Sequence, residues 1–111
     1  MTIDWYTLLS QAGYPVAYNH FPPADDTYAP PSPPYVIWLT PHQQHSGADA
    51  RNMLSNDSVR VELYTSNKDA AAEAKIEALL AQWPYAKDET WIPDEKLYLI
   101  SYDLQNLRRT Q

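Results

Sequence analysis

Residues 59–83, VRVELYTSNKDAAAEAKIEALLAQW, decide the fold, because within them a strand pattern changes directly into a helix pattern. From Val59 to Tyr64 apolar and polar side chains alternate, which is the period of a strand with one buried face. After Asp69 the apolar residues share one helical face; they are Ala72, Ile76, Leu79, Leu80 and Trp83. A helix that follows a strand so closely needs a sheet to lie on, and the rest of the chain must supply the other strands.

Local signals set the expected limits of this helix. Ser66 followed by Asp69 resembles a capping box, and Asn67 is an alternative cap. Glu73 and Glu77 lie off the apolar face and are predicted to point away from the core. The proline that follows Trp83 is predicted to end the helix.

The chain begins with a second, shorter helix pattern. Residues 3–12 carry apolar side chains at helical spacing, with Thr2 or Asp4 as the expected cap and Gly13 placed to close the helix. Residues 14–18, YPVAY, are predicted to be extended. Their proline cannot donate to a sheet, so this strand is expected at an edge or to begin with the proline.

Two long loops enclose a short apolar strand, residues 35–39, YVIWL, which is predicted to be central and covered on both faces. Residues 19–34 are rich in proline and are expected to form a loop longer than compact domains usually contain. They suit either a solvent-exposed spacer or an interaction arm anchored by Phe21 and Tyr28. Residues 41–57 form the second, polar loop.

The C-terminal part of the chain has the pattern of a β-hairpin. Residues 90–92 and 97–104 are strand-like and flank Pro93-Asp94-Glu95, which suits a type I turn. The acid pairs in and before this hairpin are expected to protect an exposed strand edge. Residues 105–111 are expected to fray. The large aromatic residues of this half are expected in the core, namely Trp38, Trp83, Trp91, Tyr98 and Tyr102.

Together these elements predict an α+β fold in one domain, residues 1–111. About four or five strands are expected to form a mostly antiparallel sheet, with both helices packed on one face and the long proline-rich loop outside. With 44% hydrophobic residues, the composition is not that of a disordered chain.

Composition also limits the classes of function. The chain has no Cys, which excludes disulfides, thiolate metal sites and a cysteine nucleophile, and fits a reducing compartment. No apolar run is long enough to span a membrane and no signal peptide pattern is present, so a cytosolic protein without membrane contact is expected. The net charge is −6 and Arg108-Arg109 is the only basic cluster, which disfavours a grip on nucleic acid.

The candidate chemical groups do not form a recognisable site. His42, His45 and Asp49 lie in a predicted loop and lack a clear zinc-ligand spacing. His20 lies near Asp25 and Asp26 in sequence, but no serine nucleophile or glycine-rich oxyanion loop accompanies them. We therefore expect no enzyme, no metal and no cofactor.

Several segments in order resemble a family of small tail-assembly proteins of long-tailed bacteriophages. The segments are PPYVIWL, GADARNM, VRVELYTSNKDAAAEAKIEALL and TWIPDEKLYLISYDL, and the likeness covers nearly all of residues 4–104. Members are described as tail terminator, tail-completion or tail-to-head joining proteins. The motifs are structural rather than catalytic. One departure is Ala50-Arg51-Asn52, which stands where an ADN-like segment is expected.

The resemblance implies a virion protein that forms a ring, of six subunits, at the head-proximal end of the tail tube. Such a ring ends tube growth and joins tail to head, and its expected partners are its own copies, the tail tube protein and the head-tail connector proteins. It is expected in the host cytoplasm during assembly and then in the virion, with DNA passing through it without specific binding. Loop residues without an evident core role are the expected contacts: Phe21, Tyr28, His42 and Arg51.

Two other classes of function remain open at the level of sequence. A head-completion or connector protein of the same particle shares every feature described above. A small prophage-encoded binding module is the other alternative, and it would stay monomeric with tail tubes present. An enzyme would require a pH-dependent activity that is lost on changing His20 or His42.

Overall fold

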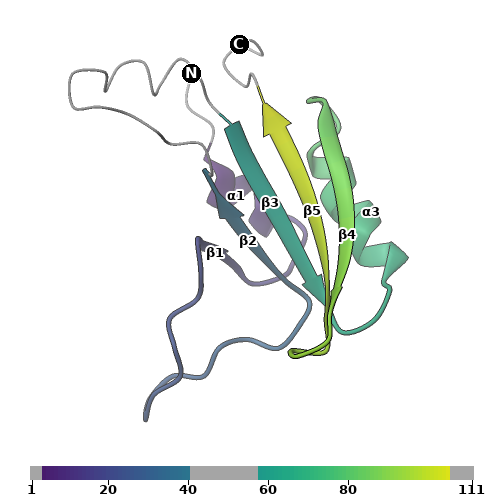
Figure 1. Ribbon diagram of the computed structural model, residues 1–111. Helices are drawn as coiled ribbons and strands as arrows, with labels where there is room; N and C mark the ends of the chain where they lie inside the picture. The colour runs from purple at the N-terminus through teal and green to yellow at the C-terminus, as the bar shows by residue number, and fades with distance from the viewer. Residues whose placement is uncertain (1–3, 41–57, 106–111) are drawn as a thin grey trace, which may run out of the picture.

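The computed structural model describes residues 4–40 and 58–105, which form a five-stranded sheet and two helices (Figure 1). In these two ranges no helix is long and apolar enough to cross a membrane. The elements are α1 (Trp5–Ser10), β1 (Val16–Tyr18), β2 (Tyr35–Leu39), β3 (Ser58–Thr65), α3 (Ala70–Leu79), β4 (Tyr85–Ile92) and β5 (Leu97–Gln105).

The sheet has the strand order β1-β2-β3-β5-β4, which confirms the predicted α+β fold. The pairings β2–β3, β3–β5 and β4–β5 are antiparallel, whereas β1 pairs parallel to β2. Both helices lie on the same face of the sheet, as predicted (Figure 1). The short β1 and the hairpin strand β4 form the two edges, so the sequence placed the strand with Pro15 correctly at an edge.

The core fills the space between this face and the two helices. Val59, Val61 and Leu63 alternate toward it along β3, and their exposed fractions are 4% or less. The rings of Trp5 on α1 and Trp83 after α3 pack with centroids 5.2 Å apart. The helices are therefore joined to each other as well as to the sheet; the remaining fully buried side chains of this core include Leu9, Ile76, Leu80, Ile100, Tyr102 and Leu104.

The cap of α3 differs from the predicted one. Asp69, rather than Ser66 or Asn67, is the N-cap, and its carboxylate accepts a hydrogen bond of 3.0 Å from the amide of Ala72. The carboxylate thereby satisfies an amide that has no partner within the helix. At the other end α3 stops at Leu79, before Trp83, which lies in a following turn.

Glu73 was predicted to point away from the core, and this is wrong. It is only 5% exposed and lies between two ammonium groups, with Lys68 Nζ at 3.0 Å and Lys87 Nζ at 2.8 Å. Lys87 also pairs with Glu77 at 2.7 Å, and Glu77 accepts a hydrogen bond of 2.9 Å from the hydroxyl of the buried Tyr102. The helical glutamates therefore bind α3 to the hairpin.

The reason is that β4 begins earlier than predicted. It starts at Tyr85, directly after the helix, rather than at Thr90, and this brings Lys87 under α3. Burial alone raises the pKa of Glu73, but hydrogen bonds from Lys87 and Lys68 outweigh it and lower the net pKa. A charge can be buried here because two opposite charges accompany it.

The rest of the hairpin follows the sequence pattern with one exception. The amide of Glu95 bonds to the carbonyl of Ile92 at 3.3 Å, as expected for a turn with Pro93 in second position. Asp88 and Glu89 lie on the edge strand β4, as predicted. Trp91 was predicted in the core, but it is 46% exposed because it lies on this same edge strand.

The first helix is also shorter than predicted. It covers Trp5–Ser10, and Asp4 caps it by accepting a hydrogen bond of 3.1 Å from the amide of Thr7. Gly13 follows with a φ of +91°, the left-handed conformation expected of a glycine that closes a helix.

The cap assignment predicts a difference between two neighbouring substitutions. Asp69→Ala is expected to lower the free energy of unfolding by about 1 kcal/mol, because the amide of Ala72 loses its partner. Asn67→Ala, at the cap proposed from sequence, is expected to leave it within about 0.5 kcal/mol of the wild type. Urea denaturation of both variants measures the two values. Equal losses would contradict Asp69 as the cap.

The buried ion pairs predict a stability loss in acid. The pKa of Glu73 is lower in the folded chain than its ordinary value of 4.5. Its contribution to stability is therefore present above about pH 4.5 and lost as the pH falls through the folded pKa. Glu73→Gln is expected to cost about 2 kcal/mol at neutral pH and to flatten the fall in stability below pH 4.5. The exposed Asp94→Asn is the control, and urea denaturation between pH 2.5 and 7 checks both.

Candidate docking pocket

The face of the sheet opposite the helices carries an aromatic pair at its centre. Tyr35 on β2 and Tyr64 on β3 are register partners, and their rings stack with centroids 5.1 Å apart and planes 24° apart. Ile37 follows on the same face and is only 5% exposed. Since both helices cover the other face, something else must cover this isoleucine.

That cover includes the proline-rich segment 19–34, which we call the arm. It leaves β1 at Asn19, which has a φ of +71° and donates its amide to the carbonyl of Trp38 at 2.8 Å. Phe21 then packs edge-on against Tyr35, with ring centroids 5.4 Å apart. At the tip of the arm, Asp25 and Tyr28 form an isolated bridge. The arm is therefore fastened to the sheet at its start and folded on itself at its tip.

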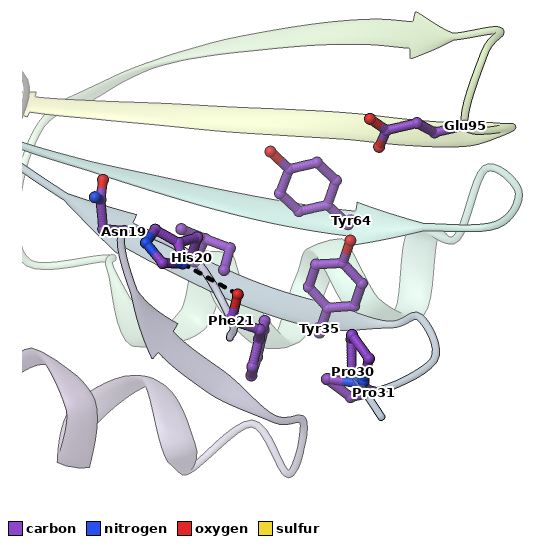
Figure 2. A pocket seen from close by; sticks show the side chains of 9 residues that line it. Asn19, His20, Phe21, Pro30, Pro31, Tyr35, Tyr64 and Glu95 are labelled. Atoms are coloured by element: carbon purple, nitrogen blue, oxygen red, sulfur yellow. Dashed lines mark hydrogen bonds between the residues drawn. The ribbon is translucent and has the colours of Figure 1, made fainter. Parts of the chain in front are cut away.

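Between the arm and the sheet lies an open pocket of about 260 Å³, which we call the arm pocket (Figure 2). The start of the arm contributes Asn19, His20 and Phe21 to it, and the returning part contributes Pro30 and Pro31. The arm thus supplies an apolar wall with two polar groups at its start.

The sheet supplies the other side of the arm pocket, namely Tyr35, Ile37 and Tyr64, and the β4–β5 turn adds Glu95. Figure 2 shows Glu95 on the opposite side of the tyrosine pair from the two prolines. Burial raises the pKa of Tyr35, and the charge of Glu95 raises it further. Burial also raises the pKa of Tyr64, as do the charge and hydrogen bond of Glu62 and, with a smaller effect, the charge of Glu95. The tyrosines are therefore neutral hydrogen-bonding groups beside a carboxylate at all physiological pH values.

A second carboxylate lies next to the arm pocket on β3. Glu62 is the register partner of Ile37, and it accepts a hydrogen bond of 2.9 Å from the hydroxyl of Tyr64. The ring of His20 donates from Nδ1 to the carbonyl of Phe21 at 3.0 Å, as the dashed line in Figure 2 shows. The arm pocket is thus an aromatic and proline-walled hollow with acidic groups at its margin.

The residues predicted as contacts are only partly brought together. Phe21 lines the arm pocket, whereas Tyr28 lies at the tip of the arm and does not line it. His42 and Arg51 lie outside the described residues. Sequence reasoning missed Tyr35, Tyr64 and Glu95 as site residues. The outward positions of the two tyrosines follow from strand alternation, but their pairing depends on the register between β2 and β3.

The residues considered as metal ligands or catalytic groups do not form a site within the described ranges. Within the described ranges no group of three or more His, Cys, Asp or Glu side chains is arranged to hold a metal ion, and His42, His45 and Asp49 fall outside these ranges. Asp25 accepts hydrogen bonds from the amide and hydroxyl of Thr27, which lower its pKa. His20 bonds to a backbone carbonyl instead of to this carboxylate.

Comparison of the chain with protein-family models, with curated proteins and with solved structures gives no match.

The contact between arm and sheet predicts a local effect of one substitution. Phe21→Ala is expected to speed hydrogen exchange at the amides of Asn19 and Asp25 by up to about tenfold, because an aromatic pair contributes about 0.5–1.5 kcal/mol. Tyr28→Ala, at the arm tip, is the control and is expected to affect Asp25 but not Asn19. Amide exchange followed by NMR measures both. An unchanged rate at Asn19 in Phe21→Ala would show that this ring does not hold the arm.

Proposed function

We propose that this chain is a structural protein of a phage tail, which forms a ring at the head-proximal end of the tail tube, ends tube growth and joins the tail to the head. The observation that carries the proposal is the order and spacing of the family-like segments over residues 4–104. The α+β fold that the order of the elements predicts is the fold of the chain, and it is compatible with this proposal.

The distribution of surfaces on one subunit supports ring formation. A closed ring needs two different patches on each subunit, because one patch of a subunit meets another patch of the next. The arm pocket lies beside β2 and β3, toward the β1 edge of the sheet. The opposite edge is β4, where Trp91 is 46% exposed. One subunit therefore offers two unlike surfaces on different sides.

The proposed mechanism is positional rather than chemical. The ring binds the last subunits of the tube, blocks the surface on which another tube subunit would add, and offers a docking surface to the connector of the filled head. Phe21, Tyr28, His42 and Arg51 are the proposed contact residues. The net charge of −6 suits a channel through which DNA passes without being held.

Tube termination can be measured directly. Light scattering measures the molar mass of the purified protein, first alone and then after incubation with tail tubes from a mutant phage that lacks it. We expect it to join tube ends as a ring and to stop further growth of the tubes. Phe21→Ala is expected to weaken this binding, while Tyr6→Ala, which removes an exposed aromatic ring from α1, serves as the matched control.

The same measurement separates the alternatives. Binding to filled heads but not to tubes would identify a head-completion or connector protein of the same particle. A protein that binds neither and stays monomeric would contradict the phage assignment and favour a small prophage-encoded binding module.

A further inference from the structure

The two carboxylates at the arm pocket have no basic partner in residues 4–40 and 58–105. Neither Glu62 nor Glu95 forms an ion pair there, whereas Lys68 and Lys87 pair with other glutamates. Arg60 forms its ion pair with Asp103 at 2.8 Å, and the nearby charge of Glu62 also raises the pKa of Arg60 without an ion pair between the two. The margin of the arm pocket is therefore negative, on a chain that is already acidic, and it is complementary to a cationic group.

The dimensions of the arm pocket indicate a side chain rather than a small molecule. Its volume of about 260 Å³ lies below the roughly 300–1,000 Å³ of typical small-molecule sites. Its walls are aromatic rings and prolines, and its polar groups lie at the edge. An arginine fits this arrangement, because its methylene stem packs on apolar walls while the guanidinium hydrogen-bonds to carboxylate and phenol oxygens.

We propose that the arm pocket binds the Arg108-Arg109 pair of a neighbouring copy of this chain. These two residues are the only adjacent basic residues in the sequence, and they follow β5 closely. The inference rests on the proposed function, since it takes the neighbouring copy to be the next subunit of the ring.

The reach of the chain favours a neighbour over the same subunit. Tyr64 pairs with Leu99, six residues before Gln105, so the tyrosine pair lies about 20 Å along the sheet from the end of β5. Arg109 follows Gln105 by four residues, which span at most about 14 Å. Glu95 is farther still, because it lies between β4 and β5 in the turn at the start of β5. Figure 1 shows this turn at the opposite end of β5 from its C-terminal end. The arginines of one chain therefore cannot bring a guanidinium to their own Glu95.

This contact would be of the head-to-tail kind. The arm pocket runs from Asn19, whose amide bonds to Trp38 at the level of Tyr102, to Glu95 in the turn before β5. The patch that carries the arginines differs from the patch that carries Glu95, so successive copies would repeat the same contact. It gives the arm a defined role: Phe21 and the two prolines form the wall against which the incoming side chain packs.

The test uses the full chain as receptor and a short peptide as probe. The receptor carries Arg108→Gln and Arg109→Gln, so that its own arginines do not compete, and the probe is a fluorescein-labelled peptide of residues 103–111. Fluorescence anisotropy is expected to show binding that weakens at least about tenfold when both peptide arginines are replaced by glutamine. Glu95→Gln in the receptor is expected to weaken binding about tenfold as well.

Asp88→Asn is the matched control for charge. Asp88 lies on the edge strand β4, pairs in register with Ser101 and does not line the arm pocket, so its substitution removes one negative charge elsewhere on the sheet. We expect it to leave peptide binding unchanged. Equal affinity for both peptides, equal effects of the two receptor substitutions, or no binding at all would each overturn the inference.

The outcomes also distinguish this inference from the proposed function. If the peptide does not bind but the protein still terminates tail tubes, the ring is held by other contacts and only the inference fails. If the peptide binds through Glu95 but the protein ignores tubes, the self-association stands and the tail assignment fails.

Discussion

The alternation of side chains along β3 divides the molecule into two faces, and the rest of the structure depends on it. Val59, Val61 and Leu63 point to the helices, while Arg60, Glu62 and Tyr64 lie on the opposite face. Full burial of an aliphatic side chain contributes about 1.5–3 kcal/mol to stability. A register slip by one residue would turn all three of these aliphatic side chains toward the other face and lose their contributions together. β3 also pairs on both sides, with β2 and β5, and thereby fixes the position of every outward group relative to its neighbours.

The helix face owes its arrangement to charge as well as to apolar packing. Helix α3 presents Glu73 to the hairpin, where Lys68 and Lys87 neutralise it. Removing a carboxylate from water is costly unless opposite charges and hydrogen bonds replace the water. The two lysines remain partly exposed, which keeps their own desolvation small. These ion pairs hold α3 against β4, in addition to the packing of its apolar residues.

The opposite face is organised by the arm. A long loop over a sheet is entropically expensive to order, but prolines limit the conformations of the unfolded chain and so reduce this cost. The arm meets the sheet where the stacked Tyr35 and Tyr64 offer a flat aromatic surface, and Phe21 packs on it. The same contacts that cover Ile37 leave the arm pocket open beside Glu95. The packing of the arm on the sheet therefore both covers part of this face and forms the arm pocket, the surface proposed for a partner.

The sequence by itself determined the elements whose signals are local. Period-2 alternation marked β3, helical spacing marked α1 and α3, and Pro93 marked the hairpin turn, because each depends on residues close in the chain. Only the tertiary structure decided that Asp69 caps α3, that β4 starts at Tyr85 and buries Glu73, and that β1 runs parallel to β2. It also decided the arm pocket, since its residues come from the arm, two strands and a turn that are far apart in sequence. Their meeting depends on strand register and charge pairing across the sheet, which no local pattern encodes.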